Sequence, residues 1–320
     1  MIDREVDFNR LRRVQCTNCK HIFTVDWNWL EESYEHKKTC KRCGIDFLYQ
    51  ESSVIPCIYN SEKALDDNSL VNMFWYHTTD IKDWPNNSYN PLDSLTEDTI
   101  KRMGGLRRAQ KWNNRMKNKA LHLGTYEASV FNMYRRIEYE DLCGNEFYLY
   151  RVKLRKDSKI YPGWKYEPAS MVGEFDRDEM CPKPYNITRY LNYYEDPGTL
   201  SLVIRPEAID STQVIGFDDI AVNKSEIENI VNKLKYISEQ NIIESTFNSI
   251  NLPQSSLECN NIFDEIFNDL PIAFSNSLRH VVQPVKNYES FANWLIVVKA
   301  FVTDYYSIKK ILDSKQLNKV

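Results

Sequence analysis

Four cysteines near the amino terminus have the types and spacing of a metal site. Cys16 and Cys19 form one C-x-x-C pair, and Cys40 and Cys43 form a second, which Gly44 follows. Zinc binds four soft ligands in a tetrahedron, and each C-x-x-C turn presents two thiolates at the required separation. We therefore predict one structural zinc ion in an N-terminal ribbon. Four thiolates leave no open position for a substrate, so the metal is expected to stabilise folding.

The loop between the two cysteine pairs mixes stacking and cationic side chains: Trp27, Trp29, Tyr34, His36, Lys37 and Lys38. This mixture suits single-stranded nucleic acid, and it suits packing against a neighbouring domain equally well. His21 and His36 are alternative metal ligands, which full cysteine coordination makes unnecessary. The ribbon is therefore expected to act either in recognition or as a scaffold.

Composition limits the class of protein. Of the 320 residues 42% are hydrophobic, with 20 Tyr, 14 Phe and 7 Trp, so the chain can fill real cores. No apolar run approaches the ~18 residues of a membrane helix, and the first residues lack the apolar core of a signal peptide. We expect a cytoplasmic protein without a membrane partner. The net charge of −4 argues against a protein that coats nucleic acid over its whole surface.

Hydrophobic spacing divides the chain into three regions. Residues 1–59 hold the cysteine pairs, and residues 70–222 show strands of period two with one helix over residues 126–137. Residues 223–320 change to helical spacing, including one long helix over residues 288–312. The predicted fold class is α+β. The helical C-terminal region is expected to pack on the middle domain, or alternatively to dock a partner chain.

Three short fragments of the middle region concentrate polar and aromatic side chains: FWYHTT at 74–79, ALHLGTYEAS at 120–129 and YLNYYEDPGTLSLVI at 190–204. In this order and with these separations they resemble the ADP-ribosyltransferase superfamily, in particular the branch whose triad is His, Tyr and Glu. The ribbon and the helical tail lie outside the resemblance. It implies an ADP-ribosyltransferase-like split β-sheet core that uses NAD as its substrate.

Glu195 is the candidate acid for this chemistry. Breaking the nicotinamide–ribose bond of NAD creates an oxocarbenium-like centre, which a nearby carboxylate stabilises, as in glycoside cleavage. His77 is expected to hydrogen-bond a ribose hydroxyl, with Thr78 adding a second polar contact. A satisfied core histidine is the competing interpretation of His77. The alternative acids are Glu127, Glu138 and Glu140.

The second fragment offers contacts for the rest of the dinucleotide. Gly124 and Thr125 are typical of a turn and an N-cap, and free amides at such a helix end suit a pyrophosphate. His122 lies on the short strand that enters this turn. Tyr126, ranked first, or Tyr134 is the candidate aromatic surface for nicotinamide, with core packing as the alternative.

Side chains for an acceptor are expected beside the acid. Transferases of this family that modify arginine carry Glu or Gln two residues before the catalytic Glu, whereas this chain has Tyr193, an aromatic that can stack on a base. Residues 101–119 contain eight basic residues, no acidic residue and Trp112. Such a segment concentrates phosphate contacts, so Arg107, Arg108 and Trp112 are further acceptor candidates. A solvated basic loop is the alternative.

These signals predict an NAD-dependent ADP-ribosyltransferase that modifies a macromolecule, preferably nucleic acid and RNA before DNA. The resemblance also implies a toxin of bacterial conflict or phage defence, which would have a neutralising antitoxin protein as a partner. Two other hypotheses stay open. One is an NAD glycohydrolase without an acceptor, and the other is a non-enzymatic zinc-ribbon protein that binds nucleic acid.

Overall fold

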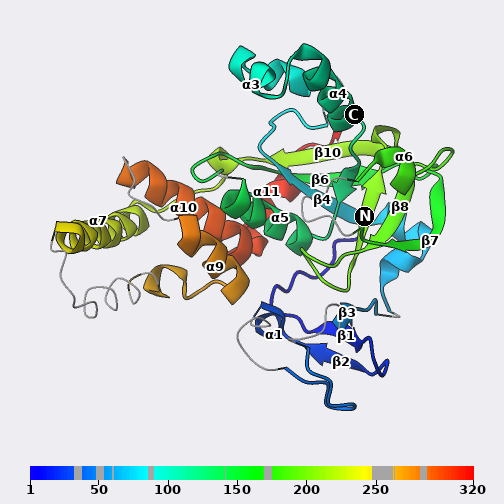
Figure 1. Ribbon diagram of the computed structural model, residues 1–320, viewed down its shortest axis with the longest axis horizontal. Helices are drawn as coiled ribbons and strands as arrows, with labels where there is room; N and C mark the ends of the chain where they lie inside the picture. Colours follow the sequence, from blue (N-terminus) through cyan, green and yellow to red (C-terminus); the bar gives the residue numbers. More distant parts are fainter. Residues whose placement is uncertain are drawn as a thin grey trace.

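The computed structural model describes residues 1–31, 38–47, 54–59, 61–85, 90–140, 142–168, 175–246, 262, 264–281 and 287–320. In Figure 1 the N-terminal ribbon lies below a pair of sheets, a helical arm lies at the opposite end, and the C-terminal helices lie to one side. The predicted α+β class is confirmed. Of the loop between the cysteine pairs, Tyr34, His36 and Lys37 lie outside the described residues.

The ribbon is a three-stranded antiparallel sheet in the order β2-β1-β3, built from β1 (Arg12–Cys16), β2 (Ile22–Val25) and β3 (Val54–Pro56). The short helix α1 (Trp27–Glu31) follows β2. The ring of Trp27 lies 5.0 Å from that of Phe131 in the middle domain, and the Arg12 guanidinium lies 4.4 Å from the Trp27 ring. An aromatic contact therefore joins the ribbon to the middle domain.

The middle domain contains two four-stranded sheets. The first has the order β11-β10-β6-β4, and its strands are β4 (Phe74–Thr79), β6 (Tyr148–Leu154), β10 (Ile209–Ile215) and β11 (Asn318–Lys319). The second has the order β5-β9-β8-β7, and its strands are β5 (Leu121–Leu123), β7 (Ile160–Tyr166), β8 (Ile187–Leu191) and β9 (Leu200–Ile204). All neighbours are antiparallel except the parallel pair β7 and β8.

The two sheets meet at one point of backbone pairing. Tyr76 of β4 and Gly124, just after β5, exchange two N–H···O=C bonds of 3.0 Å each. A side chain at Gly124 would place its Cβ 2.8 Å from that of Ala128, so only glycine fits this close approach. The junction brings the fragments that carry His77 and His122 side by side.

Helix α5 (Tyr126–Tyr139) begins at this junction, close to where the sequence predicts it. The Thr125 hydroxyl accepts the Ala128 N–H at 3.0 Å, which confirms the expected N-cap. One face of α5 packs against β4 and another against α9, so the helix is buried between the sheet and the C-terminal region.

Shorter helices connect these strands: η2 (Lys63–Leu65), α2 (Asp67–Asn72), η3 (Pro91–Ser94), α3 (Glu97–Arg102), α4 (Leu106–Lys117), α6 (Arg177–Met180), η4 (Pro206–Ala208) and η5 (Phe217–Asp219). The basic segment of residues 101–119 is largely the helix α4, not a loop. Helices α3 and α4 form the arm that projects away from the ribbon in Figure 1.

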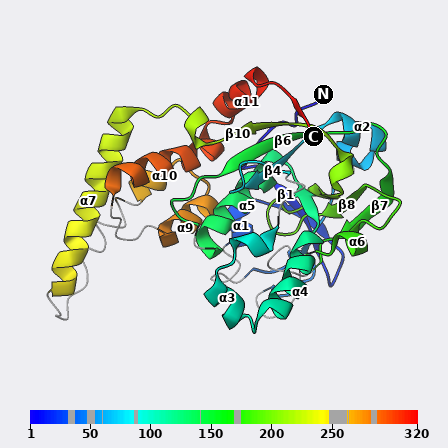
Figure 2. The same ribbon diagram turned by 90° about the horizontal axis from the view of Figure 1, so that it is seen from above.

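The C-terminal region contains α7 (Lys224–Thr246), α9 (Ile272–Val281), α10 (Tyr288–Thr303) and α11 (Tyr305–Ser314). The single helix predicted over residues 288–312 is wrong, because Asp304 leaves the helical conformation and its carboxylate accepts the Ser307 N–H that begins α11. The chain end then returns as β11 along the first sheet. Figure 2 shows α7 reaching outward from the body. No helix in the described ranges is both long enough and apolar enough to cross a bilayer.

The loop between β8 and β9, residues 192–199, is named the acid loop here because it carries Glu195. It touches the ribbon at Gly198, whose φ is +90° and where a Cβ would lie 3.0 Å from the Cys57 carbonyl oxygen. Only glycine lets the loop and the ribbon approach this closely.

We predict that Gly198→Ala destabilises the chain more than Gly163→Ala. Gly163 also has a positive φ, +70°, but open space around its missing side chain. Holding an alanine at positive φ costs about 1 kcal/mol in both variants. Only Gly198→Ala adds a collision with backbone. Urea unfolding of the two variants measures the difference, and equal losses would contradict the contact.

Candidate functional site

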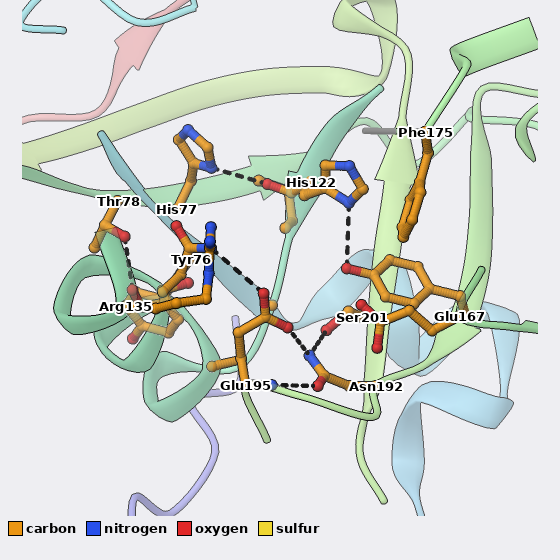
Figure 3. Close-up of a pocket in the computed structure, with 16 residues that line it drawn as sticks. Tyr76, His77, Thr78, His122, Arg135, Glu167, Phe175, Asn192, Glu195 and Ser201 are labelled. Atoms are coloured by element: carbon orange, nitrogen blue, oxygen red, sulfur yellow. Dashed lines mark hydrogen bonds between the residues drawn. The ribbon is translucent and has the colours of Figure 1, made fainter. Parts of the chain in front are cut away.

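A pocket lies where β4, β5, the start of α5 and the acid loop converge (Figure 3). Its volume is about 130 Å³. Polar side chains and aromatic rings dominate its lining: Tyr76, His77, Thr78, His122, Leu123, Gly124, Ala128, Ser129, Asn132, Arg135, Glu167, Phe175, Tyr190, Asn192, Glu195 and Ser201. Five residues predicted from three separate fragments therefore line one pocket: His77, Thr78, His122, Gly124 and Glu195.

Two side-chain amides hold the Glu195 carboxylate. The Asn192 amide donates to it at 3.1 Å and the Asn132 amide at 3.4 Å. The Asn192 carbonyl oxygen in turn accepts the backbone N–H groups of Tyr194, Glu195 and Asp196 at 2.9 to 3.1 Å. Glu195 thus sits in a tight turn organised by one asparagine.

The charge state of Glu195 reflects opposing effects. Burial raises the pKa of its carboxyl, and the positive charge of Arg135 and the two amides lower it. Arg135 and Asn132 lie on α5 and face the same pocket. Sequence reasoning missed both, although their spacing of three residues places them on one face of the predicted helix.

Glu167, just after β7, is a second pocket carboxyl that the sequence did not reveal. Its carboxylate accepts the Tyr193 N–H at 2.6 Å. Burial and the nearby charge of Glu195 raise the pKa of Glu167 to about 8, against the opposing effect of the Tyr193 N–H. At pH 7 Glu167 is therefore mostly protonated.

The His77 ring lies between a carbonyl group and a tryptophan. Its Nδ1 lies 3.0 Å from the carbonyl oxygen of His122, and its ring stacks on Trp84 at 4.3 Å. The carbonyl can only accept, so Nδ1 carries the proton and Nε2 is the acceptor. Burial lowers the pKa of His77 to about 3, so the ring is neutral at physiological pH.

His122 and Tyr190 form the opposite wall. The Nδ1 of His122 lies 3.2 Å from the Tyr190 hydroxyl, and both rings meet Phe175 edge to face. Thr78 is less available than expected, since its hydroxyl donates to the Ser129 carbonyl at 2.6 Å. The Thr78 oxygen can still accept a hydrogen bond.

Tyr126 and Tyr134 do not face the pocket. Both are fully buried, and their hydroxyls donate to the carbonyl oxygens of Phe301 at 2.8 Å and Val298 at 3.0 Å in α10. The expectation that one of them supplies an aromatic surface for nicotinamide is therefore wrong. They fasten α5 to the C-terminal helices, which is the packing alternative.

The start of α5 is also not a free anion site. Gly124 donates its N–H to Tyr76, and the Thr125 hydroxyl donates to the Asp196 carboxylate at 2.8 Å. The buried carboxylate of Glu127 accepts the Asp7 N–H at 2.9 Å at the same helix end. Two carboxylates of the chain itself already lie at this end and disfavour an anion there, so the pyrophosphate contact with Gly124 and Thr125 stays a prediction.

The acceptor candidates lie outside the pocket lining. Tyr193, in the acid loop, lies beside Glu167. Arg107 and Arg108 are exposed on α4, and Trp112 is partly buried on the same helix. The structure places these three on the projecting arm, so they do not form the pocket rim.

Comparison with protein-family models, with curated proteins and with solved structures finds no match to this chain.

The four predicted metal ligands converge in the ribbon. Their sulfur atoms all lie within 4.8 Å of one another, with Cys16 and Cys43 at 3.8 Å and Cys19 and Cys40 at 3.6 Å. Sulfurs about 2.3 Å from a tetrahedral zinc ion lie about 3.8 Å apart. The cluster therefore fits one structural metal ion such as zinc.

The two knuckles have the same backbone hydrogen bonds. Cys16 accepts from Lys20 and donates to His21, and Cys40 accepts from Gly44 and donates to Ile45, all at 2.8 or 2.9 Å. The residue after each pair takes a positive φ, 60° at Lys20 and 70° at Gly44. This repeated geometry directs both pairs of thiols toward a common centre.

We predict that Cys40→Ser removes the metal and lowers the melting temperature, because three thiolates no longer complete the tetrahedron. Elemental analysis of the purified protein gives the zinc content, and Cys143→Ser is the control cysteine variant. A Cys40→Ser protein that retains one tightly bound zinc ion per chain would contradict the site.

Because Glu167 is protonated in the folded chain, we predict that the free energy of unfolding falls as pH rises. The Glu167 pKa of about 8 exceeds the ordinary glutamate pKa of 4.5, so between these values the folded chain binds more protons than the unfolded chain. The free energy of unfolding then decreases as pH rises through this window, by an amount on the order of 1 kcal/mol or more. Glu167→Gln should flatten this pH dependence, whereas the exposed Glu97→Gln should not. Denaturant titrations at several pH values measure both slopes, and a slope unchanged in Glu167→Gln would contradict the assignment.

Proposed function

We propose that this chain is an NAD-dependent ADP-ribosyltransferase. The observation that supports the proposal most strongly is the convergence of His77, His122 and Glu195 on one pocket. They come from the three fragments that resemble the superfamily, and the pocket gives them partners suited to a sugar and its departing ring.

Glu195 is the group that stabilises the positive charge developing on the ribose of NAD. As the bond from ribose C1′ to nicotinamide breaks, its electron pair leaves with the nicotinamide nitrogen and C1′ becomes electron-deficient. The Glu195 carboxylate, fixed by the Asn132 and Asn192 amides, stabilises that centre without first reorganising. Neutral His77 accepts a hydrogen bond from a ribose hydroxyl.

Glu167 completes the transfer. The acceptor nucleophile forms its bond to C1′ and gives its proton to the ionised form of Glu167. A pKa of about 8 suits a base that must take up and release a proton near neutral pH. The two carboxyls then have separate roles, Glu195 for charge and Glu167 for the proton.

The size of the pocket limits which part of NAD enters it. At about 130 Å³ it is smaller than the roughly 300 to 1,000 Å³ of ordinary ligand sites. It therefore receives the nicotinamide–ribose end, and the adenosine half lies outside.

The proposed acceptor is nucleic acid, RNA before DNA. Tyr193 stands where arginine-modifying relatives carry an acid or amide, and α4 presents an exposed basic face for phosphates. A toxin of bacterial conflict or phage defence with a neutralising antitoxin, acting in the cytoplasm, is the biological role that the resemblance favours.

We predict that Glu195→Gln lowers NAD cleavage at least about 100-fold, because the amide cannot neutralise the oxocarbenium charge. Incubation with NAD labelled in the adenylate phosphate, with RNA, DNA or protein present, reports both nicotinamide release and label in polymer. The control is Glu226→Gln, an exposed acid on α7.

The same assay distinguishes the rivals. Nicotinamide release without labelled polymer identifies a glycohydrolase. Unchanged NAD combined with salt-sensitive RNA binding identifies a non-enzymatic binding protein. Full activity in Glu195→Gln would overturn the assignment of the acid.

A further inference from the structure

A second cavity, of about 310 Å³, separates the ribbon from the edge of the second sheet. Gln15, Ile55 and Tyr59 come from the ribbon side, and Trp164 and Tyr166 come from β7. Trp164 is 37% exposed and Tyr166 is 61% exposed, which is unusual for large aromatic side chains that adjoin a cavity. This cavity is named the aromatic slot.

A row of aromatic rings links the slot to the pocket. Ring centroids lie 5.0 Å apart for Trp164 and Tyr166, 6.4 Å for Tyr166 and Tyr193, and 6.5 Å for Tyr193 and Tyr194. Glu167 directly follows Tyr166, and Glu195 directly follows Tyr194. The row therefore passes Glu167, whose carboxylate accepts the Tyr193 N–H at 2.6 Å, and ends at the residue before Glu195.

The rings are arranged to receive a planar ligand. Trp164 and Tyr166 meet at 80°, and Tyr166 and Tyr193 meet at 60°, so neighbouring rings are not stacked face to face. A tilted contact covers at most one face of a ring. The exposed parts of Trp164 and Tyr166 are available for stacking, which every nucleobase offers regardless of sequence.

The charges around the slot favour a phosphate-bearing ligand. None of the described residues that line it is acidic. On the ribbon side the Arg13 guanidinium lies 5.9 Å from the ring of Tyr59, which lines the slot. A cation beside an aromatic surface matches a single strand, whose bases stack and whose backbone is anionic.

We propose that the aromatic slot binds an unpaired base of a single-stranded nucleic acid. The strand then passes along Tyr166 to Tyr193 in the acid loop, toward Glu195. The binding site stands on its own contacts, and only its purpose, the delivery of an acceptor nucleotide to the pocket, rests on the proposed function. The ribbon contributes one wall, so it acts in recognition as well as in packing.

The test compares oligonucleotide binding by full-length variants. Fluorescence anisotropy with a labelled 12-nucleotide RNA, on the order of one site size, measures affinity for the parent chain and for Trp164→Ala/Tyr166→Ala. We expect the double variant to bind about tenfold or more weakly, since stacking on aromatic rings is lost. The matched control is Tyr139→Ala/Tyr306→Ala, which removes two tyrosines that are 73% and 83% exposed on α5 and α11.

Two further measurements make the result decisive. Trp164→Phe/Tyr166→Phe keeps the stacking faces and should keep most of the affinity, which separates loss of stacking from misfolding. Duplex RNA of the same sequence should compete poorly, because its bases are already stacked. Equal affinity of the alanine variant and its control, or no oligonucleotide binding by the parent chain, would overturn the slot.

The outcome is separable from that of the proposed function. If the parent chain leaves NAD intact but the alanine variant loses oligonucleotide binding, the proposed binding site is supported and the proposed transferase activity is contradicted. If the parent chain cleaves NAD but the slot substitutions leave oligonucleotide affinity unchanged, the proposed NAD chemistry is supported and the proposed binding of a base by the slot is contradicted.

Discussion

The buried carboxylate of Asp196 is the constraint on which the arrangement of the site depends. It lies next to Glu195 and is 0% exposed, so it must be paired. Arg10 pairs with it directly, the Thr125 hydroxyl donates to it at 2.8 Å, and a nitrogen of Arg12 lies 3.7 Å away. The removal of one partner from such a pair typically costs several kcal/mol, about 3 to 5. Three distant parts of the chain are therefore held at one carboxylate.

These contacts also explain how the ribbon is coupled to the pocket. Arg12 belongs to β1 of the ribbon and packs on Trp27, which contacts α5 through Phe131. Burial lowers the pKa of Arg12 to about 10, so it stays charged at neutral pH despite the partial loss of water. Because the ribbon strand both pairs with Asp196 and touches Gly198, folding of the metal site and placement of the acid loop are physically linked.

The charge of Asp196 also affects the pKa of a second buried carboxyl, that of Glu127. Burial and the charge of Asp196 raise the pKa of Glu127 to about 7, so the end of α5 tolerates little further negative charge. An incoming pyrophosphate would meet Asp196 in place of open amides. The start of α5 therefore lacks the open amides that a local reading of the Gly124–Thr125 turn predicts.

Features set by local spacing could be predicted from the sequence. The cysteine pairs and the Thr125 cap depend on neighbours a few residues apart, and the structure has both of them. The convergence of His77 with Glu195 was accessible only through the resemblance. Glu167 had no such signal, because what makes it part of the pocket is the parallel pairing of β7 with β8. Pairing between strands that are distant in sequence leaves no short motif.

The wrong predictions about Tyr126 and Tyr134 have one physical cause. Tyr126 and Tyr134 are aromatic residues close to the predicted turn in sequence. However, α10 covers the face of α5 that carries them and supplies carbonyl groups to both hydroxyls. A buried tyrosine needs such a partner, and only the tertiary fold shows where it lies. Conversely, Arg135 and Asn132 look like ordinary surface positions until the acid loop folds over the other face of α5. The helix thus separates two roles by face: one fastens the C-terminal region, and the other holds the carboxylate on which the proposed chemistry depends.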